Sequence, residues 1–161
     1  MILVTIGTNE QPFDRLVSAA AGLRGLESLV VQYGSSSVPH GRGEWLDFVS
    51  FEELSERMSA ARVVICHAGV GSIMLARRCG KRPIVVPRRL HLGEAVDDHQ
   101  LPIARRLHAS GVVTLLEDVD LLAETIEVLG EAALADPVVD PPGGPNLAGD
   151  LRAYLAGLVA A

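Results

Sequence analysis

The chain has 161 residues, of which 48% are hydrophobic and 21% are charged, and its formal net charge at pH 7 is −6. This length and hydrophobic content suffice for one domain with a buried core and exclude a chain that is disordered as a whole. The acidic balance argues against a general nucleic-acid-binding protein, which needs a basic surface.

Short apolar runs alternate with amphipathic stretches, a pattern typical of βαβ units around a parallel sheet. In chain order, strands are expected at residues 2–6, 28–33, 46–49, 62–66, 82–86 and 112–115, and helices at 13–22, 51–60, 71–79, 98–109 and 118–129. Left-handed caps are expected at the ends of four helices, at Gly22, Gly80, Gly111 and Gly130. The sequence therefore predicts an α/β, Rossmann-like parallel sheet with helices on both faces.

Two stretches fit neither pattern. Residues 34–44, rich in Gly and Ser, predict a mobile surface loop, and residues 137–145, with four prolines, predict an extended strap. After the strap, four leucines at helical spacing predict a final helix: Leu147, Leu151, Leu155 and Leu158. The expected organisation is an α/β domain at 1–136, the strap at 137–145 and a C-terminal helix at 146–161 that packs on a partner or back across the sheet.

The longest apolar runs, such as 29–31 and 63–66, fall far short of the roughly 20 residues that a membrane-spanning helix needs. Residues 1–7 have no basic segment or small-residue cleavage site, so they predict a buried strand rather than a signal peptide. We expect a cytoplasmic protein. Cys66 and Cys79 lack metal-site or redox spacing and are expected to be reduced thiols in or near the core.

Positive charge is concentrated in the middle of the chain. Residues 77–106 contain eight Arg or Lys and three acidic residues, whereas every charged residue in 117–136 is acidic. A local anion site is therefore compatible with an acidic protein.

Two glycine-bearing loops each follow a predicted strand and precede a predicted helix, where open α/β sheets place their ligand crevice. They are Gly7-Thr8-Asn9 and His67-Ala68-Gly69-Val70-Gly71-Ser72. Glycine lets the backbone approach a ligand, and a helix start offers N–H groups to a phosphate. Ser72 is a candidate helix N-cap, or a residue whose hydroxyl donates a hydrogen bond to a phosphate. The alternative is that both loops are only tight turns.

Other phosphate-binding motifs are absent from the sequence. No GxxxxGK[ST] segment occurs, and Lys81 is followed by Arg82. The dinucleotide fingerprint also fails, because Met74 stands where the third glycine after Gly69 and Gly71 would be. Nicotinamide and flavin chemistry are therefore not expected.

A third loop, residues 87–100, is unusually polar. Arg88 and Arg89 are either partners of an anionic ligand or a solvated basic edge. Asp97 or Asp98 is a candidate N-cap for the following helix. His91, Asp97 and His99 do not form a favoured metal-site pattern, and no Ser or Cys lies in a nucleophile elbow.

In this order, the three loops resemble the glycosyltransferase family 28 C-terminal domain, the donor-nucleotide half of GT-B enzymes. The resemblance covers roughly residues 1–130 and rests on segments 2–8, 11–16, 67–73, 80–83 and 98–100. It is strongest to stand-alone donor subunits, similar to the cytosolic subunit of the eukaryotic two-part UDP-N-acetylglucosamine transferase and to bacterial exopolysaccharide counterparts. The implied fold is one half of a GT-B fold.

The resemblance implies a UDP-sugar substrate and an inverting hexosyl transfer that needs no tightly bound metal or cofactor. The implied donor-binding residues are Gly7, Thr8, Asn9, His67, Ala68, Gly69, Gly71, Ser72, Arg88, Arg89, Asp98 and Gln100. The diphosphate would lie against the two glycine loops, and Gln100 would bond the sugar hydroxyls. The catalytic base is expected on the acceptor half, with His99 as a candidate in this chain.

An acceptor half would need about as many residues again, because one domain has roughly 100 to 200. The implied partner is a membrane-associated, acceptor-binding subunit that would hold this chain at the membrane for polysaccharide or glycolipid synthesis. The C-terminal helix is a candidate interface. In isolation, the uncovered interdomain face could support a homodimer.

One position departs from the family pattern. Leu75 stands where family members often carry an acidic residue suited to the ribose hydroxyls, and leucine cannot accept hydrogen bonds. This favours an alternative, a non-catalytic nucleotide-binding or scaffolding subunit of a membrane glycosyltransferase complex. A third hypothesis, with lower weight, is a hydrolase or phosphatase that uses Asp97, Asp98 and His99.

Overall fold

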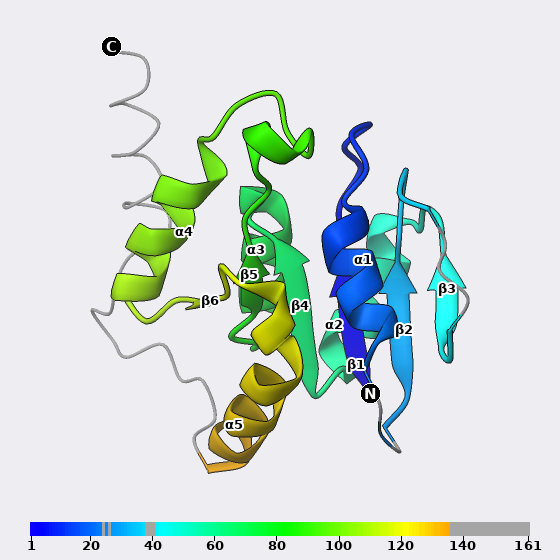
Figure 1. Ribbon diagram of the computed structural model, residues 1–161. Helices are drawn as coiled ribbons and strands as arrows, with labels where there is room; N and C mark the ends of the chain where they lie inside the picture. Colours follow the sequence, from blue (N-terminus) through cyan, green and yellow to red (C-terminus); the bar gives the residue numbers. More distant parts are fainter. Residues whose placement is uncertain (24, 26, 38–40, 136–161) are drawn as a thin grey trace.

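The computed structural model describes residues 1–23, 25, 27–37 and 41–135, with side chains as far as residue 129. Within this part of the chain, six parallel strands form one sheet in the order β3-β2-β1-β4-β5-β6 (Figure 1). The strands are β1 (Ile2–Thr5), β2 (Leu29–Gln32), β3 (Glu44–Leu46), β4 (Val63–His67), β5 (Ile84–Val86) and β6 (Thr114–Leu115). The predicted α/β class is confirmed.

Helices cover both faces of the sheet. They are α1 (Asp14–Ala21), α2 (Phe51–Ala60), α3 (Val70–Arg78), α4 (Gln100–Ala109) and α5 (Leu122–Ala135), with short 3₁₀ turns η1 (Leu90–Leu92) and η2 (Val119–Leu121). Side chains of β4 alternate between the faces, so Ile65 packs with residues of α1 and α5, whereas Val64 packs with residues of α2 and α3. Both faces of the central strands are therefore buried, which explains their unbroken apolar runs.

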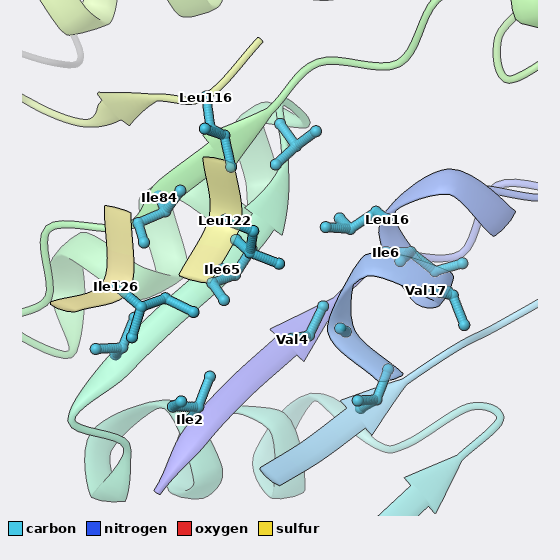
Figure 2. Packing of buried hydrophobic residues seen from close by; sticks show 14 of the residues in the cluster. Ile2, Val4, Ile6, Leu16, Val17, Ile65, Ile84, Leu116, Leu122 and Ile126 are labelled. Atoms are coloured by element: carbon cyan, nitrogen blue, oxygen red, sulfur yellow. The ribbon is translucent and has the colours of Figure 1, made fainter. Parts of the chain in front are cut away.

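The largest core cluster lies between the sheet and the helices α1 and α5. Figure 2 shows Val4 and Ile65 of the two central strands facing Leu16 of α1 and Leu122 of α5. All four side chains are buried. Burial of apolar surface at about 25 cal/mol per Å² makes this layer a main source of stability.

Several predicted elements and caps differ in the structure; β5, β6 and α5, for example, begin at Ile84, Thr114 and Leu122 rather than at 82, 112 and 118. Strand β3 runs from Glu44 to Leu46 rather than over 46–49, and beyond it the Asp47 carbonyl accepts hydrogen bonds from Gly34 N and Gln32 Nε2. Gly22 ends α1 in a right-handed conformation. Gly130 lies inside α5, among strong helix-forming residues. Helix α4 starts at Gln100 rather than residue 98.

Other local predictions are confirmed. Helix α2 has the predicted bounds, and the hydroxyl of its N-cap Ser50 accepts a hydrogen bond from Glu53 N. Gly80 and Gly111 follow α3 and α4 with positive φ angles of 70° and 73°. Cys66 is buried and Cys79 half-buried, both as free thiols, and burial raises the pKa of Cys66 to about 12.

The loop expected at 34–44 is tied down in its first part. Ser36 is buried and its hydroxyl accepts a hydrogen bond from Phe13 N at 2.6 Å, while Ser37 N donates to Asp14. The predicted strap at 137–145 and C-terminal helix at 146–161 lie outside the described residues. In the described part of the chain, every helix is too short or too polar to cross a bilayer.

Candidate functional site

The two glycine loops lie at the switch point of the sheet, where the order of the strands reverses. Strands β1 and β4 are neighbours, but β1 is followed by β2 on one side and β4 by β5 on the other. A crevice forms at the carboxyl ends of strands at such a switch point, and ligands of open α/β sheets bind there. Thr5 pairs with Cys66, so Gly7 and His67 emerge side by side at this edge.

The imidazole of His67 fills the space between the two glycines. Gly7 has a φ of +76°, and a Cβ atom there would lie 2.4 Å from His67 Cε1. A Cβ atom on Gly69 would lie 2.1 Å from His67 Nε2. Both glycines are therefore required by the histidine ring, a reason that the local sequence does not reveal.

His67 is neutral at pH 7. Burial of the ring, together with the nearby Arg88 cation, lowers the His67 pKa to about 4. The Nδ1 atom is buried and has no hydrogen-bond partner among the described residues. The neutral ring therefore adds no positive charge to the crevice.

A buried glutamine holds the first glycine turn. Gln32 Oε1 accepts hydrogen bonds from the Thr5 hydroxyl at 2.7 Å and from Gly7 N at 3.2 Å. Its Nε2 donates to the carbonyl oxygens of Gly7 at 3.0 Å and Asp47 at 2.8 Å. Sequence analysis missed this residue, although an amide that ends the otherwise apolar strand Leu29–Gln32 was a usable signal.

The second glycine loop runs directly into α3. The N-cap residue is Gly69, which has no side chain to cap the helix. Ser72 lies inside the first turn, so the interpretation of Ser72 as the N-cap is wrong. The first intrahelical bond is Ile73 N to Gly69 O at 3.1 Å, which leaves the earlier N–H groups of the turn without an intrahelical acceptor. A Cβ atom on Gly71 would meet nothing within 4 Å. This open, positive helix end can bind an anion.

Arg88 is buried rather than solvated. Its side chain has 0% exposure, and its guanidinium donates to the carbonyl oxygens of Ile6 at 3.0 Å, Gln11 at 2.8 Å and Glu94 at 2.8 Å. The interpretation of Arg88 as part of a solvated edge is therefore wrong. Because the side chain is buried, it has no exposed atom to contact a ligand in this structure. Arg89 forms an ion pair with Glu117 at 3.1 Å.

Three other polar residues of the third loop bond within the loop: Asp97, Asp98 and Gln100. Asp98 Oδ1 accepts a hydrogen bond from Leu90 N at 2.9 Å, and Asp97 Oδ1 lies 2.9 Å from His99 Nδ1. That contact lowers the Asp97 pKa. Helix α4 follows His99 without a side-chain cap, so the N-cap predictions for both aspartates are wrong. Gln100 Oε1 accepts from Arg88 N at 3.1 Å.

The other predicted site residues line the same edge. Thr8 is exposed, Ala68 is buried, and Asn9 is half-buried with its Oδ1 accepting a hydrogen bond from Gln11 N at 3.0 Å. The described residues contain no group of three His, Cys, Asp or Glu side chains that could hold a metal ion. The geometry therefore brings together two glycine turns, a neutral histidine and a helix start.

Comparisons with known proteins agree with this geometry. The glycosyltransferase family 28 C-terminal domain matches residues 1–135. The chain belongs to this family. It is 30% identical over 135 residues to "UDP-N-acetylglucosamine transferase subunit ALG13" of Yarrowia lipolytica, an alignment that covers 74% of this chain and 66% of that protein.

Further relatives are longer than this family 28 chain. A "UDP-N-acetylglucosamine--N-acetylmuramyl-(pentapeptide) pyrophosphoryl-undecaprenol N-acetylglucosamine transferase" of Aromatoleum aromaticum is 30% identical over 125 residues, covering 78% of this chain and 32% of the relative. Among solved structures, the calicheamicin glycosyltransferase CalG4 superposes with a TM-score of 0.62, 20% identity and coverage of 99% and 44%. Acinetobacter baumannii MurG superposes with a TM-score of 0.55 at 21% identity, and the match covers 80% of this chain and 40% of that protein. The fold is thus one half of the GT-B arrangement.

Leu75, the position that departs from the family pattern, belongs to the core. It is 6% exposed and packs with Leu3, Met58 and Val64 on the α2–α3 side of the sheet. An acidic side chain at this place would need to leave the core to reach a ligand. Leu75 therefore offers no hydrogen bond to a ligand in this family 28 domain.

Gly69→Ala is expected to lower the free energy of unfolding by about 1 to 3 kcal/mol, because the new methyl group overlaps the His67 ring and Gly7 blocks the ring on its other side. Urea unfolding measures this. Gly71→Ala is the matched control, with a change within about 0.5 kcal/mol, because its methyl group enters open space. Equal costs at both positions would contradict the proposed packing.

The His67 pKa predicts a pH dependence of stability. The unfolded chain binds a proton at its ordinary pKa of 6.5, whereas the folded chain does so only at about 4. Stability is therefore complete above pH 6.5 and falls as the pH is lowered, by about 2 kcal/mol between pH 7 and pH 5. Urea unfolding at these two pH values of the native chain and of His67→Gln measures the difference.

The glutamine variant should lose most of this pH dependence. Glu27, whose pKa is lowered to about 2 mainly by its hydrogen bonds with Arg62, contributes only below its ordinary value of 4.5 and does not disturb the window. An unchanged pH slope in His67→Gln would show that the ring is not held neutral by the fold.

Proposed function

We propose that this chain is the donor-binding, catalytic subunit of an inverting glycosyltransferase that moves a hexose-type sugar from a UDP-sugar to a lipid-linked or glycan acceptor. The observation that carries the proposal is the switch-point crevice, where the Gly7 turn and the open start of α3 meet around neutral His67. Relatives named as UDP-N-acetylglucosamine transferases support the donor class.

The reaction follows from the charges of the crevice. An acceptor hydroxyl attacks the anomeric carbon, a base removes the hydroxyl proton, and the bond from that carbon to the diphosphate oxygen breaks, so that UDP departs with the electron pair. Main-chain N–H groups and the dipole of α3 would stabilise the charge that grows on the diphosphate. The main chain and the helix thus supply the electrophilic assistance without a tightly bound metal.

The base and the acceptor site are assigned to a partner. The chain spans 40 to 44% of the two solved glycosyltransferases and about a third of the bacterial transferase. A membrane-associated subunit would supply the acceptor half and hold this chain at the membrane. The Yarrowia relative is itself named as a subunit of a transferase, which supports a partner subunit. The alternative base lies in this chain: His99, whose Nδ1 is 2.9 Å from Asp97 Oδ1.

Leu75 favours a second candidate, a scaffolding subunit that does not turn over donor, because this apolar side chain packs in the core instead of offering a carboxylate to a ribose. The two candidates differ in nucleotide binding. A donor subunit binds UDP with selectivity over ADP and NAD, and supports sugar transfer when it is reconstituted with the acceptor subunit.

Thermal unfolding with UDP, UDP-sugars, ADP and NAD tests the donor site. A saturating ligand at 100 times its Kd stabilises the native state by about 2.7 kcal/mol. Gly71→Asp adds a carboxylate at the open helix start and should weaken UDP binding at least about tenfold through charge repulsion. Gly71→Asn, nearly identical in shape and uncharged, should retain most of the UDP shift.

Equal UDP shifts in the two Gly71 variants would place the nucleotide elsewhere. Absence of a shift in the native chain, both alone and reconstituted with the acceptor subunit, would favour the scaffolding candidate. A shift that appears only on reconstitution would show that the partner completes the site.

A further inference from the structure

We infer that Arg88 is the positioning residue of the crevice: its buried guanidinium locks the β1–α1 connection to the β5–α4 connection, so that the two walls keep one relative position. The contacts of Arg88 are observed in the structure and do not depend on the proposed function. The consequence for a bound donor rests on the proposed function, since these connections would face the diphosphate and the sugar.

The guanidinium bridges the two connections directly. Nη2 donates to Ile6 O, immediately before Gly7, and Nη1 donates to Gln11 O at the far end of the same connection. Nη1 also donates to Glu94 O in the β5–α4 connection. A planar fork with several N–H groups can hold carbonyls from both segments at once, which a single ammonium cannot do in the same geometry.

A second set of contacts, around Glu94, lies beside the Arg88 bridge. Glu94 is 5% exposed and its carboxylate accepts two hydrogen bonds from Arg15 of α1, at 2.9 and 3.0 Å. The same carboxylate accepts a bond from Arg89 N at 3.0 Å. Phe13 lies near both guanidinium groups, with the Arg88 carbon 4.7 Å and the Arg15 carbon 5.3 Å from its ring centroid. Glu94 thus balances charge within the bridge.

The main chain of Arg88 extends the bridge to α4. Arg88 N donates to Gln100 Oε1, the first residue of the helix that would face the sugar. One residue therefore fixes the start of α4 through its backbone and the Gly7 connection through its side chain. Burying a cation costs free energy, so the convergence of carbonyl acceptors and Glu94 is what makes this arrangement stable.

Arg88 also acts on His67 through space. Its positive charge contributes, after burial, to the lowered pKa of the imidazole between the two glycines. The geometric bridge and the charge can be separated, because lysine keeps the charge but lacks the fork, whereas methionine lacks both.

Hydrogen exchange in the absence of nucleotide tests the bridge. In Arg88→Lys, amides of residues 6–13 and 88–96 should exchange at least about tenfold faster, in both segments together. Met58→Ala is the control for general destabilisation. Met58 is fully buried in the core cluster on the α2–α3 side of the sheet, so its truncation should not loosen these two segments selectively. The His67 pKa, followed by NMR, should stay low in Arg88→Lys and rise in Arg88→Met.

UDP binding provides the functional measurement. Arg88→Lys should bind UDP at least about tenfold more weakly than the native chain, which is about 1.4 kcal/mol, while Met58→Ala should bind it normally once folded. Unchanged exchange in Arg88→Lys, or loosening of only one segment, overturns the bridge. Exchange as expected with unchanged UDP affinity overturns its role in binding.

Two outcomes need separate handling. If the native chain binds no UDP, the proposed function fails but the exchange measurement still decides on the bridge. If Arg88→Lys does not fold, Arg88→Gln replaces it, because a glutamine amide is too short and has too few N–H groups to reach the carbonyls of both segments. Loosening of both segments in this variant supports the bridge, and loosening of neither overturns it.

Discussion

The parallel pairing of β1 with β4 is the constraint on which the crevice depends. It places the residues after Thr5 beside those after Cys66, so two connections that run to opposite halves of the sheet start at one point. The His67 ring occupies that point and leaves no room for a side chain on Gly7 or Gly69. Core packing therefore requires glycine at the same two positions that form the turns at this edge of the sheet.

Electrostatics in the crevice are arranged without free surface charge. Arg88 is buried and Arg15 is paired with Glu94, while His67 is neutral and Arg89 is held by Glu117. The groups left for an anion are main-chain N–H donors at the start of α3. Their effect is short-ranged and requires correct geometry. A chain of formal charge −6 can therefore bind an anion locally while its surface remains acidic.

Local patterns were sufficient for most elements but not for the residues that organise the site. Helix α2 and the caps Gly80 and Gly111 follow from neighbouring residues, and they matched. Arg88 bonds Gln11, 77 positions away, and Arg15 bonds Glu94, 79 positions away, so neither contact leaves a mark in the local sequence. For this reason Arg88 was predicted to meet ligand or solvent, and Gln32 and Glu94 were not predicted at all.

Interior polar groups of the described residues hold the crevice in shape. Gln32 holds the Gly7 turn from one side, and Arg88 with Glu94 holds the same connection from the other. The ordering of these connections is then part of folding rather than of ligand binding, so less conformational entropy is lost when a ligand arrives. Such preorganisation means that the two glycine turns and the start of α3 keep one relative position before any ligand binds.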